Sequence, residues 1–213
     1  MLTRQEIGMA KRITDYDVLR EKIPSLVKDR MGDPEEWLDT GCGMGGSIRR
    51  PMEIFGETHF HLAEPNIENM AEAKNCTDSA RCTYIASTSD ALDLKDSSFD
   101  VITAILSHHY YPDRESKLKA TSNCFRMLRK GGIFIVVEHR LSADQESADR
   151  EWRSYMERKG LEEESIREMF NRRNKVYFPM TSDEYLELLR DAGFSEIEQF
   201  WDTCSDMGFV ARK

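Results

Sequence analysis

The sequence predicts an α/β fold built on a mostly parallel β-sheet, and three observations support this prediction. Apolar, strand-like runs alternate with segments of helical spacing, which is typical of βαβ units. Two of the runs, FDVITAIL from residue 99 and IFIVV from residue 133, are almost uninterrupted and favour strands buried on both faces. The chain has 213 residues, enough for one domain with a sizeable core.

The first half of the chain supplies the first three strands of this sheet. Residues 1–31 read as an N-terminal helical segment that Pro24 breaks or kinks. Each strand that follows is short, and turn residues separate it from the next helix. The expected elements are a strand that ends at Asp39, a helix over 47–55, a strand over 59–63, a helix over 67–74 and a strand over 82–86.

The second half continues the pattern and adds a helical insertion. Residues 141–180 are expected to form this insertion, and its charged stretch over 142–172 is either a solvated cover or a lid over the site. Thr181 begins a capping pattern for the helix that follows. The remaining expected elements are helices over 115–128 and 185–192, the two apolar strands, and strands near 197–204 and 207–211. We expect residues 1–213 to form a single domain.

Charge and composition argue against several classes of function. The formal net charge is −9 and the pI is about 5.2, whereas proteins that bind nucleic acids usually carry a basic surface. No apolar run approaches the ~20 residues of a membrane span. The N-terminal residues are too charged and too polar for a signal peptide. We therefore expect a cytoplasmic protein with no membrane partner.

The cysteines and histidines do not form a metal-binding pattern. The chain has five cysteines and no CxxC pair, and free thiols fit a reducing compartment. His59 and His61 lie on one face of an expected strand, where a polar strand edge explains them without a metal. We expect no metal site.

The segment WLDTGCGMGG holds four glycines within six positions and is the most informative stretch of the chain. Glycine permits positive φ angles and close approach of a ligand. Gly41 and Gly43 fit the dinucleotide fingerprint GxGxxG, but a carboxylate just before them, at Asp39, favours a cationic ligand instead. Glu64 lies at the carboxyl end of the second strand, where open α/β sheets bind ligands. S-adenosylmethionine has a cationic amino-acid end and a ribose end that suit these two acids.

Four motifs in order resemble the class I S-adenosylmethionine-dependent methyltransferases. They are WLDTGCGMGG, HLAEPN, IASTSDALDLKDSSFDVITAILSHHY and FRMLRKGGIFIVVEH, which cover roughly residues 37–140. The resemblance implies a Rossmann-like fold whose seven-stranded sheet is mostly parallel with an antiparallel last strand. It also implies S-adenosylmethionine as the cofactor and a binding site formed by Asp39, Gly41, Cys42, Gly43, Glu64, Pro65, Thr88, Ser89 and Ile105. The acid that often reads the adenine amino group in this family is missing or is displaced to Asp90.

A narrower resemblance, over almost the full length, is to the carboxy-S-adenosylmethionine tRNA-uridine methyltransferases and their uncharacterised relatives. The Tyr-Asp pair at 16–17, the charged insertion and the ending AGFSEIEQFWDTCSDMGFVARK carry it. It implies that Tyr16 contacts the cofactor and that Arg172 or Arg173 binds an extra carboxylate on the cofactor. Two features depart from it, because Ile105 replaces a polar residue of the central strand and the acidic net charge disfavours tRNA.

Methyl transfer from a sulfonium needs alignment and exclusion of water, and a base only when the nucleophile arrives protonated. His108 and His109 follow the central strand at the edge where the methyl group would lie. Histidine titrates near neutrality, so either could act as that base, or both could be structural residues of a turn. Further candidates are Tyr110, Glu138, His139, Tyr177 and Trp201.

The sequence therefore predicts a methyltransferase that uses S-adenosylmethionine, or its carboxylated form, on a small-molecule acceptor. The runner-up acceptor is a tRNA uridine, and a homodimer could build a basic groove for it. A different class of function is a regulator that binds S-adenosylmethionine and has lost catalysis.

Overall fold

The computed structural model describes residues 4–213 and confirms the α/β prediction. The sheet runs in the order β3-β2-β1-β4-β5-β8-β7; β1 to β5 are parallel, and β8 is antiparallel to both of its neighbours. These strands are β1 (Glu36–Thr40), β2 (His59–Ala63), β3 (Cys82–Ile85), β4 (Phe99–Ile105), β5 (Leu128–Leu141), β7 (Ser195–Asp202) and β8 (Asp206–Arg212). A two-residue strand that the sequence did not indicate, β6 (Met180–Thr181), pairs with the end of β5.

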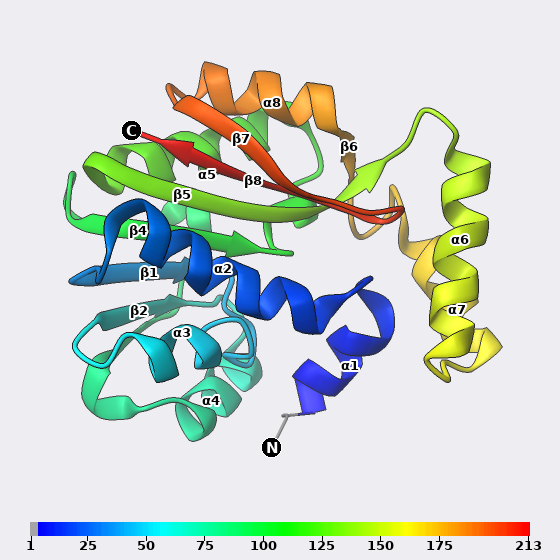
Figure 1. The fold of residues 1–213 in the computed structure, drawn as a ribbon, viewed down its shortest axis with the longest axis horizontal. Helices are drawn as coiled ribbons and strands as arrows, with labels where there is room; N and C mark the ends of the chain where they lie inside the picture. Colours follow the sequence, from blue (N-terminus) through cyan, green and yellow to red (C-terminus); the bar gives the residue numbers. More distant parts are fainter. Residues whose placement is uncertain (1–3) are drawn as a thin grey trace.

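Helices cover both faces of the sheet (Figure 1). On one face lie α2 (Tyr16–Met31), α3 (Arg49–Ile54) and α4 (Ile67–Cys76), and on the other lie α5 (Arg114–Met127) and α8 (Ser182–Asp191). Val101 belongs to the core under the first face and Ile102 to the core under the second. Because successive side chains of a strand point to opposite faces, a strand covered on both sides must be apolar throughout. Burial on both faces therefore explains the almost uninterrupted apolar run from residue 99, which forms β4.

The N-terminal helical segment is broken, but not at Pro24. It consists of two helices, α1 (Arg4–Arg12) and α2, and the break falls near Asp15, whose φ is 54°. The second helix continues through Pro24, which is buried beside Ile23 and Val27. Packing of this buried face stabilises the helix despite the lost hydrogen bond, since tertiary contacts supply most of a helix's stability in proteins.

The strand predicted over 133–137 is also longer than expected, because β5 already begins at Leu128. Gly131 and Gly132, within β5, are held at the sheet by the end of the chain. Gly131 N donates to the Lys213 carbonyl at 2.8 Å, and Lys213 N donates to the Gly132 carbonyl at 3.0 Å. A pairing with residue 213 is too distant in sequence for a local pattern to reveal.

The insertion forms two helices, α6 (Gln145–Arg158) and α7 (Glu163–Arg172), which stand with α1 beyond the carboxyl ends of the parallel strands (Figure 1). Trp152 Nε1 donates to the Arg12 carbonyl at 2.6 Å, and the Tyr155 hydroxyl donates to the Ile13 carbonyl at 2.9 Å. The insertion is therefore anchored on the N-terminal segment. Within residues 4–213, none of the helices has the length and apolar character needed to cross a membrane.

Candidate active site

A cavity of about 530 Å³ lies at the carboxyl edge of the parallel strands. The loops after β1, β2, β3 and β4 form one part of its wall, and α1, α2, the end of β5 and the insertion form the rest. The predicted site residues that line it are Tyr16, Gly41, Cys42, Gly43, Glu64, Pro65, Thr88, Ser89, Ile105, His109 and Arg172. Asp39 and His108 are not part of the wall. Of the further candidates, Tyr110, His139 and Tyr177 line the cavity, whereas Glu138 and Trp201 do not. The topology thus brings together side chains that are up to 156 positions apart, from Tyr16 to Arg172.

The glycine loop packs tightly against the end of the central strand. Gly41 has φ 76°, and its N–H donates to the Ala63 carbonyl at 2.8 Å. A Cβ added at Gly41 would lie 2.3 Å from Ser107 Cβ, closer than atoms can approach. Ser107 is fixed in turn by a hydrogen bond from its Oγ to the Thr40 carbonyl at 2.9 Å. Glycine is required here both for the backbone angle and for this contact.

Asp39 lies beneath the glycine loop rather than in the cavity wall. It is 1% exposed, and its carboxylate accepts hydrogen bonds from Thr103 Oγ1 at 2.6 Å and from Ser47 Oγ at 2.7 Å. Burial raises the pKa of Asp39 to about 6, so it is mostly ionised at neutral pH. Ser47 itself lines the cavity, so Asp39 acts on the site through Ser47 and through its charge.

Glu64 holds the glycine loop and the start of the next helix together. Its carboxylate accepts hydrogen bonds from Gly43 N at 3.0 Å and from Asn66 N at 2.9 Å. The residue is 7% exposed, and its remaining surface faces the cavity. A carboxylate oxygen can accept more than one hydrogen bond, so Glu64 still has capacity for hydroxyl groups of a ligand.

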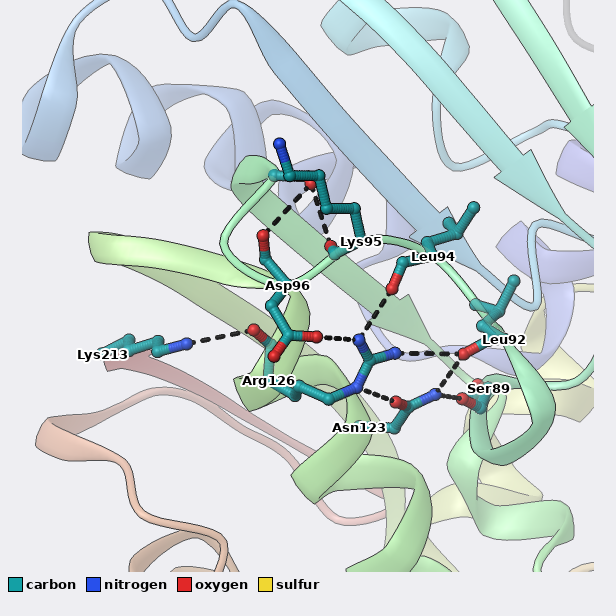
Figure 2. A network of polar contacts seen from close by, with 9 residues as sticks. Ser89, Leu92, Leu94, Lys95, Asp96, Asn123, Arg126 and Lys213 are labelled. Atoms are coloured by element: carbon teal, nitrogen blue, oxygen red, sulfur yellow. Dashed lines mark hydrogen bonds and ion pairs between the residues drawn. The ribbon is translucent and has the colours of Figure 1, made fainter.

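The loop after β3 carries Thr88 and Ser89 and is held from below by α5 (Figure 2). Asn123 Nδ2 donates to the Ser89 carbonyl at 2.7 Å, and the Arg126 guanidinium donates to the Leu94 carbonyl at 2.7 Å. These side-chain contacts fix a segment that has little regular structure of its own. The loop therefore presents Thr88 and Ser89 to the cavity from a rigid support.

Asp90, the alternative adenine-reading acid, already has partners and is not part of the cavity wall. It accepts hydrogen bonds from Thr88 Oγ1 at 2.8 Å and from the Tyr111 hydroxyl at 3.0 Å, and it pairs with Lys119. It therefore helps to shape the loop, whereas Thr88 and Ser89 line the cavity.

The two predicted histidines lie in different surroundings. His108 is fully buried, and its Nε2 lies 3.1 Å from Ser89 Oγ while its carbonyl accepts a hydrogen bond from Lys117 Nζ at 2.8 Å. Burial lowers the pKa of His108 to about 3. The expected substrate-side role does not fit His108, because the turn after β4 directs its ring into the core. His109 does line the cavity.

His109 has no strong partner at its ring. Its Nδ1 makes no hydrogen bond within residues 4–213 and lies 3.6 Å from Glu138 Oε2, beyond hydrogen-bond distance. Burial, with the nearby His139 and Lys117, holds the pKa of His109 well below its usual range. It is neutral at physiological pH and binds a proton weakly.

His139, only a weaker candidate from the sequence, lines the cavity and has a carboxylate partner. Its Nδ1 lies 2.7 Å from Asp206 Oδ1. The antiparallel pairing of β5 with β8 places these two residues directly opposite each other. A histidine at a strand end was visible in the sequence, but its partner 67 positions away was not.

The two arginines at the end of α7 also separate. Arg173 makes two hydrogen bonds to the Asp149 carboxylate, at 2.7 and 2.8 Å, which fixes it outside the cavity wall. Arg172 lines the cavity and has no carboxylate partner within residues 4–213. Tyr16 lines the opposite part of the wall at the start of α2, and burial raises its pKa.

No group of three or more His, Cys, Asp or Glu side chains that could hold a metal ion occurs among residues 4–213. His61 instead pairs with Glu36 at 2.8 Å, and His59 lies 2.9 Å from Thr83 Oγ1.

Comparison with known proteins agrees with this geometry. Residues 38–136 match the model of a methyltransferase domain. A sterol 4-C-methyltransferase of Caenorhabditis elegans is 30% identical over 116 residues, which are 54% of this chain and 34% of that protein. The chain thus spans about a third of the length of this relative. The carboxy-S-adenosyl-L-methionine synthase of Staphylococcus epidermidis is 25% identical over 181 residues, which are 82% of this chain and 77% of that protein.

Solved structures share the fold. Human N-acetylserotonin methyltransferase in complex with SAM superposes with a TM-score of 0.66 at 14% identity, covering 98% of this chain and 55% of that one. The likeness confirms the Rossmann-like methyltransferase fold that the motifs implied.

Proposed function

We propose that the chain is an S-adenosylmethionine-dependent methyltransferase that transfers a methyl group to a small-molecule acceptor, which the match of residues 38–136 to a methyltransferase domain supports. The observation that carries the proposal is the cavity whose wall contains both the glycine loop and Glu64. Bound there, S-adenosylmethionine supplies an electrophilic methyl group on a positively charged sulfonium. The predicted enzyme class and cofactor agree with the family match.

The residues present fit this cofactor. Gly41 and Gly43 leave room for close approach, and Glu64 accepts hydrogen bonds from the ribose hydroxyls in our assignment. Asp39, ionised at neutral pH, contributes a negative potential that favours the cationic amino-acid end. Thr88 and Ser89 face the adenine side, and Ile105 and Tyr16 border the methyl region.

The size and cover of the cavity support a small-molecule acceptor. A volume of about 530 Å³ lies in the range of ordinary small-molecule sites. The anchored insertion and α1 border it, which leaves little room for a folded RNA, and the net charge of −9 disfavours a polyanion. The sterol methyltransferase relative also acts on a small molecule by its name.

Calorimetry with S-adenosylmethionine tests the cofactor site, and Glu64→Ala provides the decisive variant. We expect the variant to bind more than about tenfold more weakly, because charge-assisted hydrogen bonds to the ribose are lost. Glu68→Ala, at an exposed position in the first turn of α4, is the matched control and should bind like the wild type. Equal affinity of wild type and Glu64→Ala would refute the assignment of Glu64.

Methyl transfer itself is tested with labelled S-adenosylmethionine and a panel of small hydroxyl, amine and thiol acceptors. Transfer of the labelled methyl group to any of these acceptors would support the proposal that the protein is an enzyme. Tight cofactor binding with no transfer to the whole panel would favour the alternative of a non-catalytic regulator.

A second candidate is a reaction of the carboxylated cofactor, as in the carboxymethyl transfer to tRNA uridine that the narrower resemblance implied. Arg172 favours it. Of the arginines whose side chains the structure describes, it is the one half-buried guanidinium without a carboxylate partner. The similarity to a carboxy-S-adenosyl-L-methionine synthase, over 77% of that protein, also supports it.

Arg172→Gln separates the two cofactors. If the carboxylated form is the natural one, we expect the variant to lose about tenfold in affinity for carboxy-S-adenosylmethionine and little for the plain form, because a guanidinium–carboxylate pair is removed. Arg167→Gln, on the exposed side of the same helix and outside the cavity wall, is the control. An Arg172→Gln variant that binds both forms like the wild type would remove the support for this candidate.

A further inference from the structure

A buried histidine–aspartate pair borders the cavity on the side of the insertion. His139 ends the buried part of β5, and Asp206 begins β8 directly opposite it. Asp206 is 0% exposed, whereas His139 is 7% exposed and lines the cavity. Because Nδ1 of His139 is taken by the carboxylate at 2.7 Å, its Nε2 is the nitrogen left for a ligand, and Nε2 makes no hydrogen bond within residues 4–213.

The aspartate is held rigidly in its place. Ser205 Oγ donates to Asp206 Oδ2 at 2.5 Å, and Asp206 N donates to Thr203 Oγ1 at 3.0 Å. A carboxylate can only accept hydrogen bonds, so the imidazole must carry its proton on Nδ1 in this geometry. The lone pair of Nε2 is then free, as a general base requires.

Aromatic groups from several elements enclose the histidine. The rings of His139 and His109 stack at 4.8 Å, and Trp152 from α6 and Tyr177 from the loop after α7 lie at 5.4 and 5.0 Å. Glu138, the preceding residue of β5, faces His109 rather than His139. Such surroundings hold the imidazole in one orientation.

His109 is the weaker base of the two. No carboxylate accepts from its ring, and burial lowers its pKa well below the usual range. The carboxylate beside His139 instead fixes the tautomer and the orientation of its ring.

We propose that His139 is the general base of this site, oriented by Asp206, and that the acceptor is a hydroxyl group. The inference rests on the proposed methyl transfer and deepens it, since it assigns the acceptor class. The O–H bond of the acceptor breaks and its proton passes to Nε2. The electron pair left on oxygen forms the bond to the methyl carbon, and the electrons of the broken carbon–sulfur bond stay on sulfur. Solvent then takes the proton from Nε2.

Nitrogen NMR of histidine-labelled protein tests the dyad without any acceptor. We expect the neutral imidazole of His139 to carry its proton on Nδ1 in the wild type. In the Asp206→Asn variant, we expect a measurable fraction of His139 to carry the proton on Nε2 instead. His61, which also pairs with a carboxylate but lies outside the cavity, is the internal control and should not change in that variant. A wild-type His139 protonated on Nε2 would overturn the proposal.

Kinetics with two probe acceptors separate a base from a structural residue. Phenol must lose a proton on transfer, whereas thiophenol is largely ionised at neutral pH and needs no base. We expect His139→Gln to lower kcat with phenol about 100-fold or more, and at least tenfold more than with thiophenol. His61→Gln should leave both rates unchanged, and equal losses with both probes in His139→Gln would assign His139 a structural role only.

The test also separates this inference from the cofactor assignment. Calorimetry with S-adenosylhomocysteine should give wild-type affinity for His139→Gln. If the wild type does not bind S-adenosylhomocysteine, the proposed function is contradicted. If it binds but His139 is protonated on Nε2, only the role of the His139–Asp206 pair is contradicted.

Discussion

Replacing Gly41 with alanine should abolish measurable binding of S-adenosylmethionine and lower the free energy of unfolding by about 3 kcal/mol or more. Two effects combine. The φ of 76° strains any side chain by about 1 kcal/mol or more, and the new Cβ would lie 2.3 Å from Ser107 Cβ and 2.9 Å from its Oγ. Ser107 cannot move freely because its hydroxyl is bonded to the Thr40 carbonyl. The loop or the end of β4 must therefore shift, and both line the cavity.

Gly32→Ala is the matched control for this prediction. Gly32 has a φ of 81°, but nothing lies within 4 Å of a Cβ added there, at the end of α2. The control should therefore show the backbone strain alone, with a loss of about 1 kcal/mol and unchanged cofactor affinity. Urea unfolding and calorimetry on both variants measure the two effects. Wild-type affinity in Gly41→Ala would show that the glycine loop does not form the cofactor site.

The parts of the site that could be predicted are those that a local pattern encodes. The glycine loop and Glu64 are each recognisable within a few residues, because their chemistry depends on backbone angles and on a strand end. The sheet was equally predictable, since burial on both faces makes a strand such as β4 predominantly apolar. Only β6, with its two residues, was too short to leave such a pattern.

The parts that could not be predicted depend on contacts between distant residues. His108 and His109 are neighbours of the same type, and only the turn after β4 decides that one enters the core and the other the cavity. The partner of His139 comes from β8, through strand pairing that no local spacing reports. The helix is not broken at Pro24 for the same reason, because buried packing against the sheet overrides its helix-breaking tendency.

Glu138→Gln should change how stability depends on pH. Glu138 is 2% exposed, and burial raises its pKa to about 8, opposed by the nearby Lys117. Below the usual carboxyl pKa both the folded and the unfolded chain hold the proton. Between the usual carboxyl pKa and pH 8, the unfolded chain releases the proton of Glu138, whereas the native protein keeps it. The free energy of unfolding of the wild type therefore falls by up to about 1.4 kcal/mol per pH unit as the pH rises. Above about pH 8 this loss levels off.

The glutamine variant removes this dependence and keeps the geometry, since its amide oxygen can still accept the hydrogen bond from His108 N, now 2.9 Å from Glu138 Oε1. We expect the difference in unfolding free energy between variant and wild type to grow by about 2–4 kcal/mol from pH 5 to pH 8, in favour of the variant. Asp39 and His108 also titrate abnormally, but they are present in both proteins and cancel in the difference. Urea unfolding across this range measures it. Parallel curves for the two proteins would mean that Glu138 is already ionised in the native state, stabilised there by Lys117.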